Sequence, residues 1–81
     1  MTYQHILEKY KDNPEDLTLV RMPDVEIASG LKRSAIYKRI ADGTFPAPIK
    51  ITSRCSAWIK GEINEWIAKR IDGTRNQSEV A

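Results

Sequence analysis

The chain has 81 residues, of which 41% are hydrophobic and 30% charged, a composition typical of one small globular domain. Its single cysteine, Cys55, excludes an intramolecular disulfide, and no cluster of Cys and His residues has the spacing of a zinc site. No apolar run is long enough to cross a bilayer, and the N-terminal region is too acidic for a signal peptide. We therefore expect a cytoplasmic protein that is not an enzyme and that uses no cofactor, membrane or small-molecule ligand.

Basic residues are concentrated in the middle of the chain, although the formal net charge is only +2. Residues 31–60 contain seven Lys or Arg residues against Asp42 alone, whereas the segments on either side have an acidic excess. A local positive field of this kind attracts phosphate backbones. A solvated basic face that binds nothing is the alternative, and charge alone does not distinguish the two.

The first segment, residues 1–18, is predicted to be a helical appendage. Its apolar residues recur at helical spacing and form a one-sided stripe, made of Tyr3, Ile6, Leu7 and Tyr10. Pro14 ends this helix because proline restricts the preceding residue and cannot donate a hydrogen bond to a continuing helix. The stripe within residues 3–10 is a candidate surface for self-association.

Two short helices separated by a glycine turn are predicted next. The first begins at Met22-Pro23, and Gly30 is its expected stop. Its apolar contacts are expected to come from Val25, Ile27, Ala28 and Leu31. The second helix covers residues 33–42, with Ile36 and Ile40 one turn apart and directed into the core. Helix, glycine turn and helix form a helix-turn-helix, although a plain αα-hairpin without DNA binding has the same pattern.

The outward face of the second helix has a composition that fits a DNA major groove. With Ile36 and Ile40 inward, a period of about 3.6 residues puts Ser34 and Lys38 on the solvent side. Short side chains permit close approach, while Arg33 and Lys38 can reach base edges or phosphates. Tyr37 flanks this face, and we expect it to contact DNA, with core packing as the alternative.

A β-hairpin is predicted after the second helix. Ile49-Lys50-Ile51 alternates apolar and basic residues as a half-buried strand does, and residues 55–58 return as the partner strand. The turn between them carries Arg54. A hairpin with outward Lys50 and Arg54 has the features of a wing that lies along a phosphate backbone.

The last predicted helix carries an apolar stripe from Ile59 to Ile71. Gly61 is its expected N-cap. Trp58, just before it, and Trp66, within it, are expected to be core residues rather than base-stacking groups. A frayed tail is expected over residues 72–81, which show no apolar period.

Several short motifs follow one another in unbroken order from about residue 20 to residue 71. They are Arg21-Met22-Pro23-Asp24-Val25, the runs 30–37 and 43–51, Arg54, Trp58, Glu62-Ile63 and Trp66-Ile67. This ordered set resembles the AlpA family of phage-type transcriptional regulators. The resemblance implies a fold that is mainly α with a small β-hairpin, a winged helix-turn-helix related to MerR regulators and excisionases.

The resemblance also implies double-stranded DNA as the partner. The expected DNA-binding residues lie on or beside the recognition helix and on the wing, and they are Lys32, Arg33, Ser34, Tyr37, Lys38, Lys50 and Arg54. We expect residues 33–42 to enter the major groove and the wing, residues 49–58, to follow the backbone. The winged helix-turn-helix itself is expected to cover residues 19–71.

The predicted function is sequence-specific DNA binding by a transcriptional regulator of a prophage or mobile element. One alternative shares the fold: an excisionase-like recombination directionality factor that bends DNA. A more distant alternative is a protein-interaction adaptor that does not bind DNA. The target site and the direction of regulation do not follow from the sequence.

Overall fold

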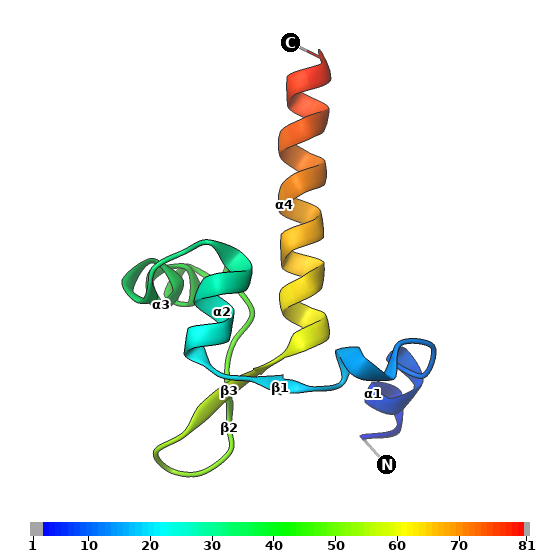
Figure 1. The fold of residues 1–81 in the computed structure, drawn as a ribbon, viewed down its shortest axis with the longest axis vertical. Helices are drawn as coiled ribbons and strands as arrows, with labels where there is room; N and C mark the ends of the chain where they lie inside the picture. The colour runs from blue at the N-terminus through cyan, green and yellow to red at the C-terminus, as the bar shows by residue number, and fades with distance from the viewer. Residues whose placement is uncertain (1–2, 81) are drawn as a thin grey trace.

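The structure is a computed structural model, and it describes residues 3–80, with side chains as far as residue 75. Helices dominate it, and three short strands form one small sheet (Figure 1). The elements in chain order are α1 (Gln4–Lys9), the 3-10 helix η1 (Pro14–Asp16), β1 (Leu19–Val20), α2 (Met22–Ser29), α3 (Arg33–Asp42), β2 (Ile49–Lys50), β3 (Ser56–Ile59) and α4 (Lys60–Val80). The predicted fold class, mainly α with a small β-hairpin and compatible with a winged helix-turn-helix, is confirmed.

The turn between α2 and α3 depends on a left-handed glycine. Gly30 has φ 76°, a conformation that glycine adopts without a steric penalty, and its N–H donates to the Glu26 carbonyl at 2.9 Å. The Ser29 hydroxyl accepts a hydrogen bond from the Leu31 N–H at 3.2 Å. Gly43 ends α3 in the same way, with φ 80°. Both predicted glycine stops are confirmed.

Helix α2 contributes fewer core residues than the sequence predicts. Val25 is fully buried, but Ile27 is 81% exposed and Ala28 is also exposed. The prediction that Ile27 and Ala28 pack inward is therefore wrong. At about 100° per residue, Ile27 lies about 200° around the helix from Val25, so the two cannot face the same core.

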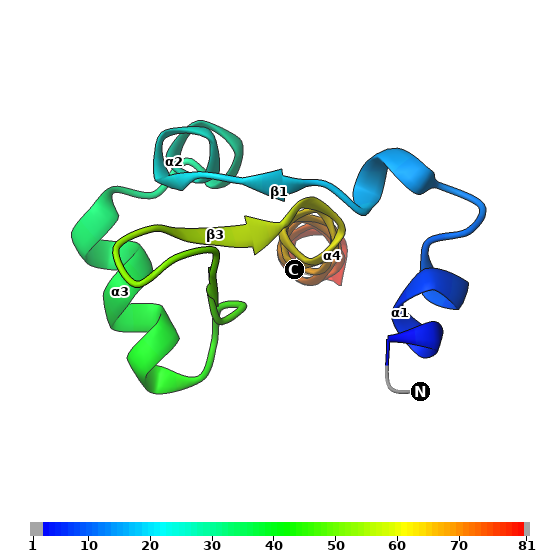
Figure 2. The same cartoon turned by 90° about the horizontal axis from the view of Figure 1, so that it is seen from below.

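Strand β3 is the centre of the sheet, in the order β1-β3-β2, with both pairings antiparallel. Val20 lies opposite Trp58, and Lys50 lies opposite Ser56. The β2–β3 hairpin confirms the two predicted strands. Strand β1 was not expected, because two residues are too short to show an alternating pattern. It ties the segment before α2 to the centre of the sheet (Figure 2).

The core lies where α2, α3, α4 and the sheet meet. Its buried side chains are Val25, Ile36, Phe45, Trp58 and Ile63. The Trp58 indole N–H donates to the Pro46 carbonyl at 3.0 Å, and the Trp66 indole N–H donates to the Thr44 carbonyl at 2.8 Å. Trp66 is half-buried and its ring centroid lies 4.9 Å from that of Phe45. The core role predicted for both tryptophans is confirmed.

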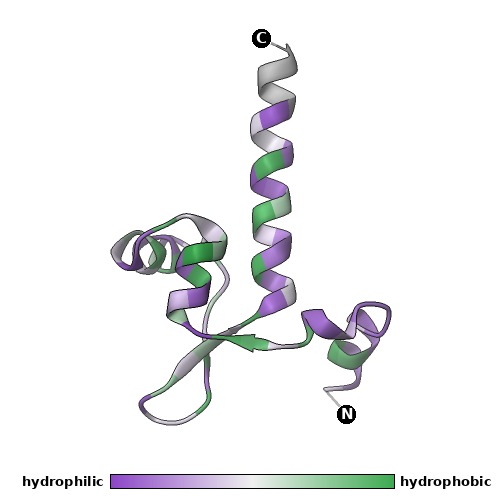
Figure 3. Ribbon diagram, in the orientation of Figure 1, coloured by the Kyte–Doolittle hydropathy of each residue, from purple (hydrophilic) through white to green (hydrophobic). Residues whose placement is uncertain are grey.

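Helix α4 begins earlier and ends later than the sequence predicts. Gly61 is not an N-cap: it lies inside the first turn, buried, and a Cβ on it would overlap the Tyr10 ring. The helix continues past residue 71 to Val80 and extends away from the domain, with hydrophobic residues interspersed among hydrophilic ones (Figures 1 and 3). The helix can continue because residues 72–80 contain no proline. Gly73 costs only about 1 kcal/mol of helix stability, and the first turns of the helix are already packed on the domain. No helix in residues 3–80 is long and apolar enough to cross a membrane.

The segment before β1 packs on the first turns of α4. Tyr10 is buried against Gly61, and the Asn64 side-chain amide donates to the Asp16 carboxylate at 3.0 Å. Lys9 and Glu65 form an ion pair at 3.5 Å, and the Glu65 carboxylate raises the pKa of Lys9. The first segment contains a helix as predicted, but α1 ends at Lys9 rather than at Pro14, and the segment is docked on the domain. Met1, Thr2 and Ala81 lie outside the described residues, and the division at residues 18 and 71 stays a prediction.

Candidate nucleic-acid interface

The outward face of α3 is exposed to solvent. Arg33, Ser34 and Lys38 are exposed, and Tyr37 retains 42% of its surface, whereas Ile36 on the opposite side is fully buried. Lys32 is the N-cap residue of α3 and is also exposed. The five predicted residues of this region therefore lie together on one accessible surface. Their role in binding stays a prediction.

Hydrogen bonds stabilise the turn of the hairpin that follows α3. The Ile51 N–H donates to the Cys55 carbonyl at 2.8 Å, and the Thr52 hydroxyl accepts from the N–H groups of Arg54 (3.2 Å) and Cys55 (3.1 Å). Lys50 and Arg54 are both exposed. Residues directly opposite each other in an antiparallel pair project from the same face, so Lys50 shares a face with Ser56.

A cleft lies between α3, the hairpin and the start of α2. Its lining includes three arginines, Arg21, Arg33 and Arg54, each from a different element, and no carboxylate. The other lining residues are Met22, Pro23, Tyr37, Ser56 and Trp58. Arg21 is not among the site residues that the sequence predicts. Arg21 opens the first of the family motifs and directly precedes the first turn of α2, but nothing in the sequence shows that it meets Arg33 and Arg54.

Among the described residues, the basic side chains of this surface form no ion pair, although one carboxylate, Glu26, lies close to them. This holds for each of the predicted basic site residues and for Arg21. The ion pairs Lys9–Glu65 (3.5 Å) and Lys11–Glu8 (3.9 Å) lie instead at α1 and the start of α4. Half-buried Glu26 lies beside Lys32 and Arg33 in a shallow depression and lowers the potential there. The Arg33 guanidinium lies 5.6 Å from the centre of the Tyr37 ring. This cation–π contact does not neutralise the positive charge of Arg33.

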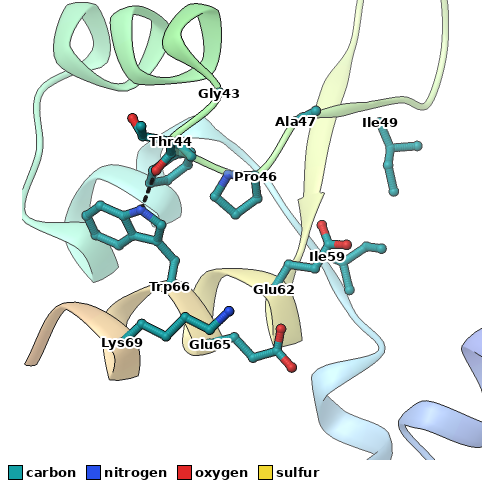
Figure 4. Close-up of a pocket in the computed structure, with 11 residues that line it drawn as sticks. Gly43, Thr44, Pro46, Ala47, Ile49, Ile59, Glu62, Glu65, Trp66 and Lys69 are labelled. Carbon is teal, nitrogen blue, oxygen red and sulfur yellow. Dashed lines mark hydrogen bonds between the residues drawn. The ribbon is translucent and has the colours of Figure 1, made fainter. Parts of the chain in front are cut away.

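A second groove lies on the opposite face of the hairpin and has a different character (Figure 4). Its apolar lining includes Phe45, Ile49, Ile59 and Trp66. Both Glu62 and Glu65 line it, with Lys69 as the one basic lining residue. Two carboxylates disfavour a phosphate backbone here. Among the side chains of residues 3–75, no group of three or more His, Cys, Asp or Glu is arranged to hold a metal ion.

Comparison with known proteins identifies the family. Residues 18–71 match the family model described as prophage CP4-57 regulatory protein (AlpA). The chain belongs to the AlpA family. The resemblance seen in the sequence motifs is therefore confirmed, and the matched region extends from just before β1 into the middle of α4.

Two known proteins, one from a phage and one from a bacterium, are similar to this chain. The uncharacterized protein ORF88 of Enterobacteria phage P4 is 38% identical over 56 residues, which are 69% of this chain and 64% of that protein. The chain thus spans less than two thirds of that relative's length. The DNA-binding transcriptional activator AlpA of Escherichia coli strain K12 is 29% identical over 65 residues, which are 73% of this chain and 93% of that protein.

Proposed function

We propose that this AlpA-family protein is a sequence-specific DNA-binding transcriptional regulator of a prophage or mobile element. The observation that carries the proposal is the exposed, basic surface formed by α3 and the β2–β3 hairpin, whose cations have no carboxylate partner among the described residues. The name of the Escherichia coli relative, a DNA-binding transcriptional activator, supports the same function.

In this proposal α3 enters the major groove. Ser34 is small enough to allow the helix close to the base pairs, and Arg33 and Lys38 are long enough to reach base edges. Tyr37 contributes an aromatic edge with a hydroxyl. The N-terminal residues of a recognition helix are those that contact bases in helix-turn-helix proteins, and Arg33 is the first residue of α3.

The hairpin acts as the wing. Lys50 and Arg54 neutralise backbone phosphates beside the groove, and Lys32 does so at the start of α3. One such module buries only about 600–1,000 Å² of protein surface, so useful affinity calls for more than one copy on neighbouring sites. Tyr10 of the stripe in residues 3–10 is buried within the chain, so Leu7 of α1 and its N-cap residue Tyr3, which are 45% and 59% exposed, are our candidates for contact between copies.

Two single substitutions test whether the helix contacts bases and the wing contacts phosphates. We expect Arg33→Ala to cost about 1–3 kcal/mol on the preferred site and to relax base preference, because a base contact is lost. Lys50→Ala is expected to weaken binding to all sequences alike, because a phosphate contact carries no sequence information. The measurement selects duplexes from a randomised pool with each variant, then compares affinities for the preferred and a scrambled duplex.

The control is Arg75→Ala, which removes an exposed charge from α4, outside the proposed surface. A base-specific effect of Lys50→Ala together with a uniform effect of Arg33→Ala would mean that helix and wing are misassigned.

Selected sites that cluster at an attachment site and are bent on binding would favour the excisionase-like alternative. Absence of any salt-dependent binding to duplex DNA would favour the adaptor, which does not bind DNA.

A further inference from the structure

Three arginines that are far apart in the sequence converge on one cleft. Arg21 is the N-cap residue of α2, Arg33 is the first residue of α3, and Arg54 belongs to the turn of the hairpin. All three line the cleft between these elements, and no Asp or Glu does. Like charges gathered without a carboxylate repel one another, so this arrangement favours an anionic ligand.

The arginines are positioned by contacts that leave their charges available. The Arg21 Nη2 group donates to the Cys55 sulfur at 3.5 Å, a weak interaction that directs the side chain toward the hairpin. Arg33 rests against the Tyr37 ring at 5.6 Å. Arg54 follows Thr52, whose hydroxyl fixes the turn by accepting the Arg54 N–H. A guanidinium has five N–H donors, so most of them remain for a ligand.

We propose that this cleft binds one backbone phosphate of the DNA duplex and that Arg21 and Arg54 are the residues that hold it. The proposal rests on the DNA-binding function proposed above and adds to it a contact from α2. A planar guanidinium can donate two parallel hydrogen bonds to two oxygens of one phosphate. Arg33, in the same cleft, extends from α3 toward the neighbouring base edge and adds to the positive potential.

The site has a mechanical consequence for recognition. A phosphate held by α2 on one side and by the hairpin on the other fixes the duplex against both halves of the interface at once. The position of α3 along the groove is then set by a contact that reads no base, since phosphate contacts determine register and base contacts determine sequence. The wing alone would leave α3 free to shift along the groove.

The test compares Arg21→Gln with the wild-type protein and with Arg75→Gln, which makes the same charge change on α4. We expect Arg21→Gln to bind every duplex about tenfold more weakly at moderate salt and to reduce the slope of log affinity against log salt by about one. Arg75→Gln should match wild type in both. Thermal unfolding of all three is expected to agree, because Arg21 is exposed.

A second variant separates phosphate binding from a purely structural role of Arg21. Cys55→Ala removes the acceptor of the Arg21 hydrogen bond but keeps the guanidinium. If Arg21 serves only to anchor the hairpin, Cys55→Ala will weaken DNA binding as much as Arg21→Gln does, and the proposed site is wrong. We expect Cys55→Ala to bind DNA within about twofold of wild type.

The decisive arm uses duplexes in which single phosphates are replaced by uncharged methylphosphonates. We expect one position at which the replacement weakens wild-type binding but has no further effect on Arg21→Gln or Arg54→Gln. Unchanged affinity of Arg21→Gln, or equal sensitivity of wild type and variant at every position, would overturn the site. A wild-type protein that binds no duplex would instead overturn the proposed function itself, and the site with it.

Discussion

Replacing Trp58 with alanine is expected to destabilise the domain by about 3–5 kcal/mol, the usual cost of truncating a buried aromatic side chain. Trp58 is 1% exposed and is the largest fully buried side chain among the described residues. Its removal leaves a cavity beside Ile36 and Ile63 and an unpaired Pro46 carbonyl. Small domains are stable by about 5–15 kcal/mol in total, so a large part of the stability of an 81-residue chain would be lost.

Urea denaturation followed by circular dichroism measures this effect. Trp58→Phe is the matched control, because it keeps an aromatic ring in the core but cannot donate to the Pro46 carbonyl, and we expect a cost of about 1–3 kcal/mol. A midpoint for Trp58→Ala equal to that of wild type would contradict the core described here. Loss of DNA binding by Trp58→Ala would follow from unfolding alone.

The second large effect concerns the contact between the N-terminal segment and α4. Gly61→Leu puts a side chain where the Tyr10 ring lies, so we expect residues 3–18 to undock. Removing Tyr10 from its buried position costs about 1.5–3 kcal/mol. Limited trypsin digestion reports the change directly, because Lys9 and Lys11 lie in the undocked segment and become cleavable.

Gly73→Ala is the control within the same helix. A Cβ at Gly73 meets nothing within 4 Å, so alanine there is expected to stabilise the helix by about 0.5–1 kcal/mol. Affinity of Gly61→Leu for a single DNA site should stay close to wild type, because α1 and α3 lie on opposite sides of α4 (Figure 2). Trypsin resistance of Gly61→Leu equal to that of wild type would contradict the docking.

The sequence predicted those parts of the fold that have local causes. Gly30 and Gly43 end helices by adopting a left-handed conformation, and that requirement is visible in the residue type. Ile36 is buried because helical periodicity directs it inward. The ordered motifs also predicted the family, which the match over residues 18–71 confirms.

The sequence did not predict features that depend on contacts between distant segments. Gly61 has the sequence character of a helix cap, yet the structure places it under Tyr10, and no local rule pairs these two residues. Strand β1 exists because Val20 meets Trp58 on β3. Arg21 becomes part of the candidate interface only when the hairpin folds against α2. In each case the information lies in the tertiary arrangement.

The central claim, that the surface of α3 and the hairpin binds duplex DNA, is tested most directly by amide chemical shifts during titration with a duplex. We expect the largest changes at residues 32–38 and 50–55, with Arg21 among them, and little change at Glu62 and Glu65 in the groove of Figure 4. Changes confined to α4 and that groove, with the amides of α3 unmoved at saturation, would contradict the claim.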